Sequence, residues 1–113
     1  MDKRAIRQRL LRHRQQLTDQ SCRTLSQKIQ QNLVVADCFS SSRTLALYSP
    51  IHNEVRTDLL FLEACSAGKQ VCFPRVCGER LQFVVVDSID ALESGTFGVC
   101  EPVAGTLVSP EDI

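Results

Sequence analysis

Two groups of side chains in this sequence have the types and the spacing that ligand chemistry needs, and the first group is basic. Residues 1–14 hold six lysines and arginines against one aspartate, whereas the rest of the chain carries seven basic and twelve acidic side chains. The formal net charge of zero therefore conceals a cationic segment that is suited to an anionic ligand. On a helical wheel Lys3, Arg7 and Arg14 fall within about 40° of one another, beside an apolar stripe.

The second group follows two segments that have the pattern of buried strands. Residues 44–48 are apolar on both faces, which is typical of a parallel sheet, and residues 70–73 repeat this pattern until Pro74 ends it. In open α/β sheets, ligands bind at the carboxyl ends of the strands. The candidate side chains at these two strand ends are Ser49, Pro50, His52, Asn53, Glu54, Pro74 and Arg75.

Glu54 is the best placed of these candidates, because a carboxylate accepts two hydrogen bonds side by side from ring N–H groups. Together with Arg75 it would suit a polar heterocycle or a carboxylated substrate. Each residue also has a structural interpretation. Glu54 and His52 would be solvated loop side chains, Arg75 would form a salt bridge, and Lys3 and Arg7 would belong to a hydrated helix face.

Two helices are expected ahead of the strands. Residues 2–17 contain no glycine or proline and place Ile6, Leu10 and Leu17 on one face. Thr18 and Asp19 can cap a second helix that runs to about residue 36. Its apolar stripe consists of Cys22, Leu25, Ile29 and Leu33. We therefore expect an antiparallel helical hairpin over residues 1–40.

The predicted fold class is α/β, with this hairpin followed by a Rossmann-like, mostly parallel sheet over residues 44–113. Between the first two strands Thr57 is expected to cap a helix that Gly68 ends, which completes a βαβ unit. Residues 80–86 predict a third strand after a turn at Gly78, residues 90–93 a helical turn, and the chain from residue 95 onward an irregular segment. Because such a sheet has open edges, we expect one domain whose C-terminal part of the sheet is missing.

Composition excludes several classes of protein. The chain is 43% apolar and 23% charged, as in soluble domains, and it has no apolar run long enough for a membrane span. The six cysteines form no CxxC pair and lie far from both histidines, so we expect free thiols in a reducing cytoplasm and no zinc site. Ser49 lacks a recognisable histidine and acid, which argues against a hydrolase. The Gly95–Gly98 turn lacks the ending of a phosphate loop.

Four motifs in register resemble the 5-formyltetrahydrofolate cyclo-ligase family, whose members are also called methenyltetrahydrofolate synthetases. In order, the motifs are Lys3-x3-Arg7, then Tyr48-Ser49-Pro50-Ile51-x2-Glu54-Val55-x-Thr57, then Gly68-Lys69-x-Val71-x2-Pro74-Arg75-Val76, and finally Gly95-x-Phe97-Gly98-Val99-x-Glu101-Pro102. Each motif alone is weak, whereas their shared order and spacing from residue 3 to about residue 102 are specific.

The resemblance implies an enzyme that uses ATP and Mg²⁺ to convert 5-formyltetrahydrofolate to 5,10-methenyltetrahydrofolate, as a monomer without nucleic-acid or membrane partners. By position it implies a nucleotide-binding segment and a folate pocket in which Glu54 holds the pterin ring. The ATP-binding residues would be Lys3, Arg4, Ala5, Ile6 and Arg7, and the substrate-binding residues Ser49 and Glu54. Pro74, Phe97 and Glu101 would form the nearby framework, and Arg14 and Arg75 are further candidates. The resemblance assigns no catalytic residue.

The sequence departs from the family pattern at two points. Arg56 stands where an acidic or small polar residue is usual, and the chain lacks the later segment that in the family supplies an arginine, tyrosines and the Mg²⁺ ligand. This leaves two further hypotheses. One is a catalytically inactive module whose basic helix docks an acidic partner or an RNA backbone, and the other is a chain that does not fold stably.

Overall fold

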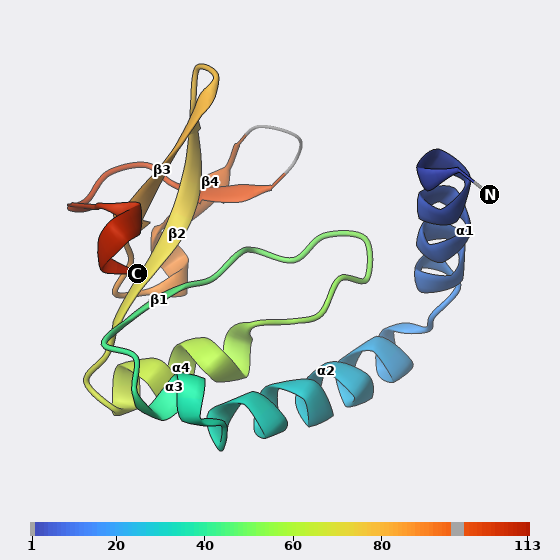
Figure 1. Cartoon of the computed structure of the whole chain (residues 1–113), viewed down its shortest axis with the longest axis horizontal. Coiled ribbons are helices and arrows are strands. Elements are labelled where there is room, and N and C mark those ends of the chain that lie inside the picture. Colours follow the sequence, from blue (N-terminus) through green and yellow to red (C-terminus); the bar gives the residue numbers. More distant parts are fainter. Residues whose placement is uncertain (1, 96–98) are drawn as a thin grey trace.

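The structure is a computed structural model that describes residues 2–95 and 99–113. In it three helices precede a mixed sheet, and a fourth helix connects the first two strands (Figure 1). The helices are α1 (Lys3–Gln15), α2 (Asp19–Val34), α3 (Asp37–Ser40) and α4 (Asp58–Ser66). The strands are β1 (Thr44–Ala46), β2 (Gln70–Cys77), β3 (Arg80–Val85), β4 (Leu92–Ser94), β5 (Cys100–Pro102) and β6 (Leu107–Val108). None of the helices described is both long and apolar enough to cross a membrane.

The α/β class is as predicted, but the sheet is less parallel than expected. Its four strands have the order β1-β2-β3-β6, in which only β1 and β2 run parallel, while β2–β3 and β3–β6 are antiparallel. The reason is the short turn after β2. Cys77 pairs with Arg80, and Gly78 between them adopts a left-handed φ of 63°. A turn this short can join only antiparallel strands.

Pro74 does not end β2, contrary to the prediction. The strand continues to Cys77, and Pro74 pairs with Phe83 of β3. Proline removes a backbone donor, which disrupts a strand only where a neighbour needs that donor. The pairing of β1 with β2 ends at Cys72, so among the described residues no strand pairs with β2 on that side at Pro74.

The last third of the described chain is more regular than predicted. The helical turn expected at residues 90–93 is a 3-10 turn over Ile89–Ala91, and the chain then enters β4. β4 pairs with β5 in a separate two-stranded sheet, and β6 joins the edge of the main sheet. A second 3-10 turn spans Pro110–Asp112.

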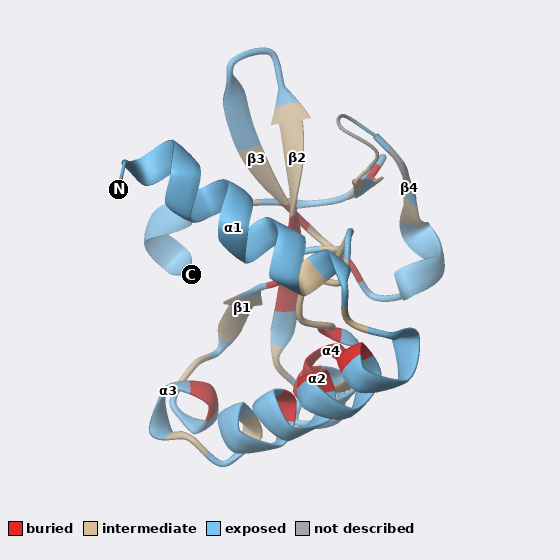
Figure 2. Ribbon diagram, turned by 90° about the vertical axis from the view of Figure 1, so that its right-hand side faces the viewer, coloured by how far each residue is buried: buried red, intermediate tan, exposed pale blue. Residues whose placement is uncertain are grey.

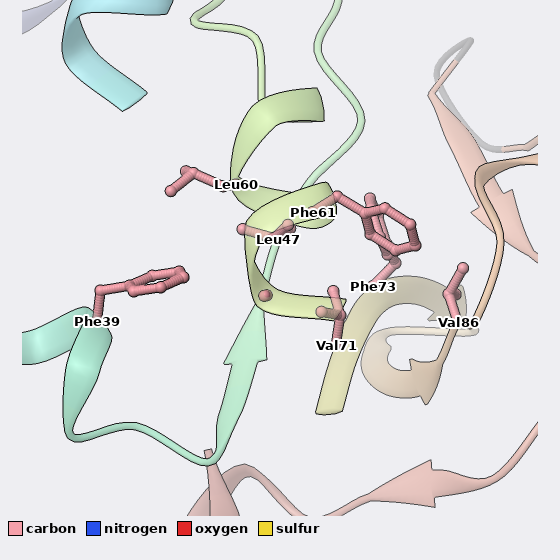
Figure 3. Close-up of a cluster of buried hydrophobic side chains, with 8 residues drawn as sticks. Phe39, Leu47, Leu60, Phe61, Val71, Phe73 and Val86 are labelled. Carbon is pink, nitrogen blue, oxygen red and sulfur yellow. The ribbon is translucent and has the colours of Figure 1, made fainter. Parts of the chain in front are cut away.

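The core lies between α4 and the sheet (Figure 3). Leu60, Phe61 and Ala64 of α4 are buried against Val71 and Phe73 of β2. The Phe61 and Phe73 rings are 6.2 Å apart between centroids and inclined at 53°, a tilted arrangement that aromatic pairs favour. α4 and β2 therefore form the stable centre of the fold.

The buried face of α2 shares Cys22 with the predicted stripe but is otherwise shifted around the helix. Its buried residues are Cys22, Ser26 and Gln30, while Leu25, Ile29 and Leu33 of the expected stripe remain 47%, 42% and 39% exposed. The cause lies in α4, whose first-turn N–H groups need acceptors. Gln30 Oε1 accepts from the Leu60 N–H at 3.1 Å.

Thr57 occupies the N-cap position of α4, as predicted, but its side chain does not cap the helix. Its hydroxyl instead donates to the Tyr48 carbonyl at 2.8 Å. Gln30 takes over the capping contact from α2 and also donates through Nε2 to Asp58 Oδ1 at 3.4 Å. A polar contact thus joins α2 to the start of α4.

α1 forms as predicted but does not pack along α2. It rises away from α2 instead of lying antiparallel beside it (Figure 1). No residue of α1 is buried (Figure 2). Ile6 and Leu10, which were expected to face a partner, are 41% and 56% exposed, so this face of the helix is not covered as predicted.

The cysteines divide into two groups. Cys22 and Cys72 are buried, and burial raises the pKa of the Cys72 thiol above its ordinary value. Cys65 of α4 is exposed. The other exposed thiols are Cys38, Cys77 and Cys100.

Candidate ligand-binding site

A cavity of about 360 Å³ lies beside the loop that leaves β1, which is within the size range of small-molecule sites. Residues 49–54 of this loop form much of its wall, and Phe73, Ile89 and Leu92 contribute apolar surface. The structure therefore brings both predicted substrate-binding residues, Ser49 and Glu54, to one cavity.

Glu54 is held in place by its own loop. Its Oε1 accepts from the Ile51 N–H at 2.9 Å, and its N–H donates to the Ile51 carbonyl at 3.0 Å. Oε2 has no hydrogen-bond partner among residues 2–95 and 99–113. The loop thus orients a carboxylate that retains a free acceptor oxygen at the wall of the cavity.

Tyr48 and Thr57 close the base of the loop. The Tyr48 hydroxyl donates to the Val55 carbonyl at 2.7 Å, and the Thr57 hydroxyl returns to the Tyr48 carbonyl. Partial burial raises the pKa of Tyr48 above its ordinary value, and the negative charge of Glu54 raises it further, while Arg14 acts in the opposite direction. The Tyr48 phenol is therefore neutral at neutral pH.

The predicted nucleotide-binding residues lie apart from this cavity. Lys3, Arg4, Ala5, Ile6 and Arg7 are all exposed on the first turns of α1, and none of them lines the cavity. Arg14, at the other end of α1, donates from Nε to the His52 carbonyl at 3.0 Å. Arg14 lies eleven positions after Lys3, which is about 16 Å along a helix.

Arg75 does not join Glu54 in the cavity, contrary to the expectation that both would follow strand ends. It lies within β2, where it donates to the Val103 carbonyl at 2.7 Å and to Gln82 Oε1 at 2.6 Å. Glu101, a predicted framework residue, accepts from the Val76 N–H at 2.8 Å. Phe97, the other residue predicted for that framework, lies outside the described residues.

Two residues near the cavity were not assigned a role from the sequence. Arg56 lines the cavity and forms an ion pair with Asp19 at 2.6 Å. Asn53 binds the end of α1, and both it and His52 adopt left-handed φ angles, of 62° and 50°. Asparagine tolerates this conformation better than most residues, which is the one sequence signal for the turn. Within the described ranges, no three His, Cys, Asp or Glu residues gather as a metal site.

The fold and the cavity define an α/β domain whose candidate ligand site lies where the chain leaves a parallel strand. The chain belongs to the 5-formyltetrahydrofolate cyclo-ligase family, which it matches over residues 1–111. The resemblance that the four motifs indicated is therefore confirmed.

Two solved structures show the same fold. One is a 5,10-methenyltetrahydrofolate synthetase from Aquifex aeolicus, with a TM-score of 0.87 and 37% identity over 100% of this chain and 58% of that chain. The other is a 5,10-methenyltetrahydrofolate synthetase from Mycoplasma pneumoniae, with a TM-score of 0.67 and 32% identity over 78% of this chain and 56% of that one. This chain thus spans less than two thirds of either relative. No curated protein matches it.

Proposed function

We propose that the cavity binds 5-formyltetrahydrofolate and that the chain takes part in its ATP-dependent conversion to 5,10-methenyltetrahydrofolate. One observation carries the proposal: the Glu54 carboxylate is oriented by Ile51 at the wall of a small-molecule cavity. The printed functions of the two solved relatives support the choice of reaction.

Glu54 would recognise the pterin ring. Its carboxylate is fixed by the loop before a ligand arrives, so little ordering is required when ring N–H groups donate to it. Ser49 would add a hydroxyl that can donate or accept, and Phe73 would supply an apolar wall for the flat ring. A charged hydrogen bond of this type contributes about 1.5–3 kcal/mol.

The exposed cations of α1 would bind the phosphates of ATP. Lys3 and Arg7 share one face of the helix and carry no ion pair within the described part of the chain. Their chemistry fits a triphosphate, whose developing charge cations offset during phosphoryl transfer. The residues described here do not define a Mg²⁺ site, so the proposal assigns the metal to none of them.

The reaction would proceed in two steps. Transfer of the γ-phosphoryl group to the formyl oxygen releases ADP and turns that oxygen into a leaving group. The N10 lone pair then attacks the formyl carbon, the C–O bond breaks as phosphate departs, and the N10 proton is lost. Because N10 is tethered to the carbon that it attacks, a residue that holds the ring still favours closure.

The proposal is tested by following 5,10-methenyltetrahydrofolate through its near-ultraviolet absorbance, with ATP, Mg²⁺ and 5-formyltetrahydrofolate. We expect turnover by the chain, a large loss in Glu54→Gln, and unchanged turnover in Glu63→Gln, which alters an exposed carboxylate on α4. Equal turnover by all three proteins would contradict the assignment of Glu54, and absence of both turnover and folate binding would contradict the proposed function.

The exposure of α1 favours a second candidate, an inactive module that docks an anionic partner through this helix. Binding of that kind weakens steeply as salt increases, because it depends on counterion release. RNA binding with a steep salt dependence, without any folate binding, would favour this candidate.

A further inference from the structure

Apart from its covalent link to α2, α1 is joined to the rest of the described chain by hydrogen bonds to one turn. None of its residues is buried, so apolar packing does not fix its direction. In the described part of the chain, its side-chain hydrogen bonds to later elements all reach His52 and Asn53. The position of the whole helix, including its basic first turns, therefore depends on these two residues.

Asn53 supplies two of the three contacts. Its Nδ2 donates to the Arg14 carbonyl at 3.1 Å and to the Leu17 carbonyl at 2.9 Å. Arg14 lies in the last turn of α1, and Leu17 lies two residues beyond the end of the helix. The Asn53 amide NH₂ group has two donors, one for each carbonyl oxygen. An ionised aspartate has no donor, so it could not replace these contacts.

The same turn carries the ligand-recognition carboxylate. Glu54 follows Asn53 directly, and its side chain is tied back to Ile51. His52 and Asn53 hold left-handed φ angles of 50° and 62°, a conformation that side-chain contacts must stabilise. A ligand that orders this turn from the cavity would therefore also order the attachment of α1.

We propose that Asn53 is a positioning residue that holds α1 on the cavity loop, so that occupancy of the cavity and the orientation of Lys3 and Arg7 are coupled. The tether rests on geometry alone. The identity of the two coupled ligands rests on the proposed function. Because coupling between two binding sites is reciprocal, each ligand strengthens the binding of the other.

Hydrogen exchange of the intact chain tests the tether without any ligand. Asn53→Gly deletes the amide but retains access to the left-handed backbone. His52→Gly is the matched control, since it makes the same change at a residue that contacts Arg14 only through its backbone carbonyl. We expect α1 amides to exchange about tenfold faster in Asn53→Gly. In His52→Gly, and in β2 and β3 of both variants, exchange should be unchanged. Unchanged α1 exchange in Asn53→Gly, or equal acceleration in both variants, would overturn the tether.

Calorimetric titration of ATP with and without saturating 5-formyltetrahydrofolate tests the coupling. We expect ATP to bind about fivefold more tightly to the folate-saturated chain, and this gain to disappear in Asn53→Gly. An equal gain in the variant would overturn the coupling. Failure of the unmodified chain to bind folate would overturn the proposed function and the coupling with it, while the exchange experiment would still decide the tether.

Discussion

α1 and the unit formed by α4, β2 and β3 are held in place by different forces. No residue of α1 is buried, whereas Val71, Cys72 and Phe73 of β2 are 2%, 0% and 1% exposed. Burial of apolar surface stabilises the second region, while three polar contacts orient the first. The stability of the fold therefore resides around β2, and α1 is a peripheral helix whose side chains stay exposed.

The two candidate binding regions, the cavity and the cations of α1, also differ in how they are held. The cavity with Ser49 and Glu54 is built against Phe73, so it shares the stable region. The cations of α1 are carried by a helix of 13 residues, a length that is marginally helical in isolation. Substitutions in the core around β2 should therefore lower the stability of the fold, whereas substitutions of the cations on α1 should leave it nearly unchanged.

The largest effect on stability is expected from Phe73→Ala. Phe73 is 1% exposed and packs against Phe61, so its truncation leaves a cavity in the core. We expect the free energy of unfolding to fall by about 3–5 kcal/mol in urea denaturation. Leu62→Ala is the control, because Leu62 is 63% exposed on α4 and should change little. Equal losses in both variants would refute this location of the core.

A smaller effect is expected from Gln30→Ala, which removes the cap that α2 provides to α4. The Leu60 N–H would lose its acceptor in a buried place, so we expect a loss of about 1–3 kcal/mol in the free energy of unfolding. Gln31→Ala, at the exposed neighbouring position, should be nearly neutral. If Gln30→Ala were also neutral in denaturation, α2 would not be held to α4 through this contact.

The smallest effect is a change in the ionisation of Tyr48. The chain has one tyrosine and no tryptophan, so tyrosinate absorbance reports this residue alone. Its pKa is raised mainly by burial and then by Glu54, so Glu54→Gln should lower it while leaving it above that of the unfolded chain. Arg14→Gln should raise it, because Arg14 acts against the other two causes.

The raised pKa of Tyr48 also determines how the stability of the fold changes with pH. The pKa of Tyr48 is higher in the folded chain than in the unfolded chain. Its contribution to the free energy of unfolding is therefore fully present below the ordinary tyrosine pKa of 10.0 and is lost as pH rises through the folded pKa. Alkaline denaturation of the chain checks this direction. If the pKa of Tyr48 were unchanged in Glu54→Gln, the charge of Glu54 would not act on the tyrosine.

Local signals in the sequence predicted much of this fold. The Thr18 side chain caps α2 by accepting from the Ser21 N–H at 3.0 Å, and Gly68 follows α4 with a left-handed φ of 73°. The βαβ unit and the placement of Ser49 and Glu54 also follow from short-range patterns. Caps, turns and strand ends are set by residues close in the chain, so they can be recognised without the structure.

The remaining features depend on contacts between distant residues. Gln30 lies 30 residues before Leu60, and nothing in the periodicity of α2 indicates that its buried face would be the polar one. The direction of α1 depends on Asn53, which lies 39 residues beyond Arg14. A helical wheel reports which residues share a face, but not which face another element will cover.

Calorimetric titration of 5-formyltetrahydrofolate into the unmodified chain, Glu54→Gln and Glu63→Gln tests whether the cavity binds folate through Glu54. We expect the unmodified chain and Glu63→Gln to bind equally, and Glu54→Gln to bind at least about tenfold more weakly, as the loss of a charged hydrogen bond implies. Equal affinity in all three proteins, or no binding by the unmodified chain, would contradict the assignment of this cavity to folate.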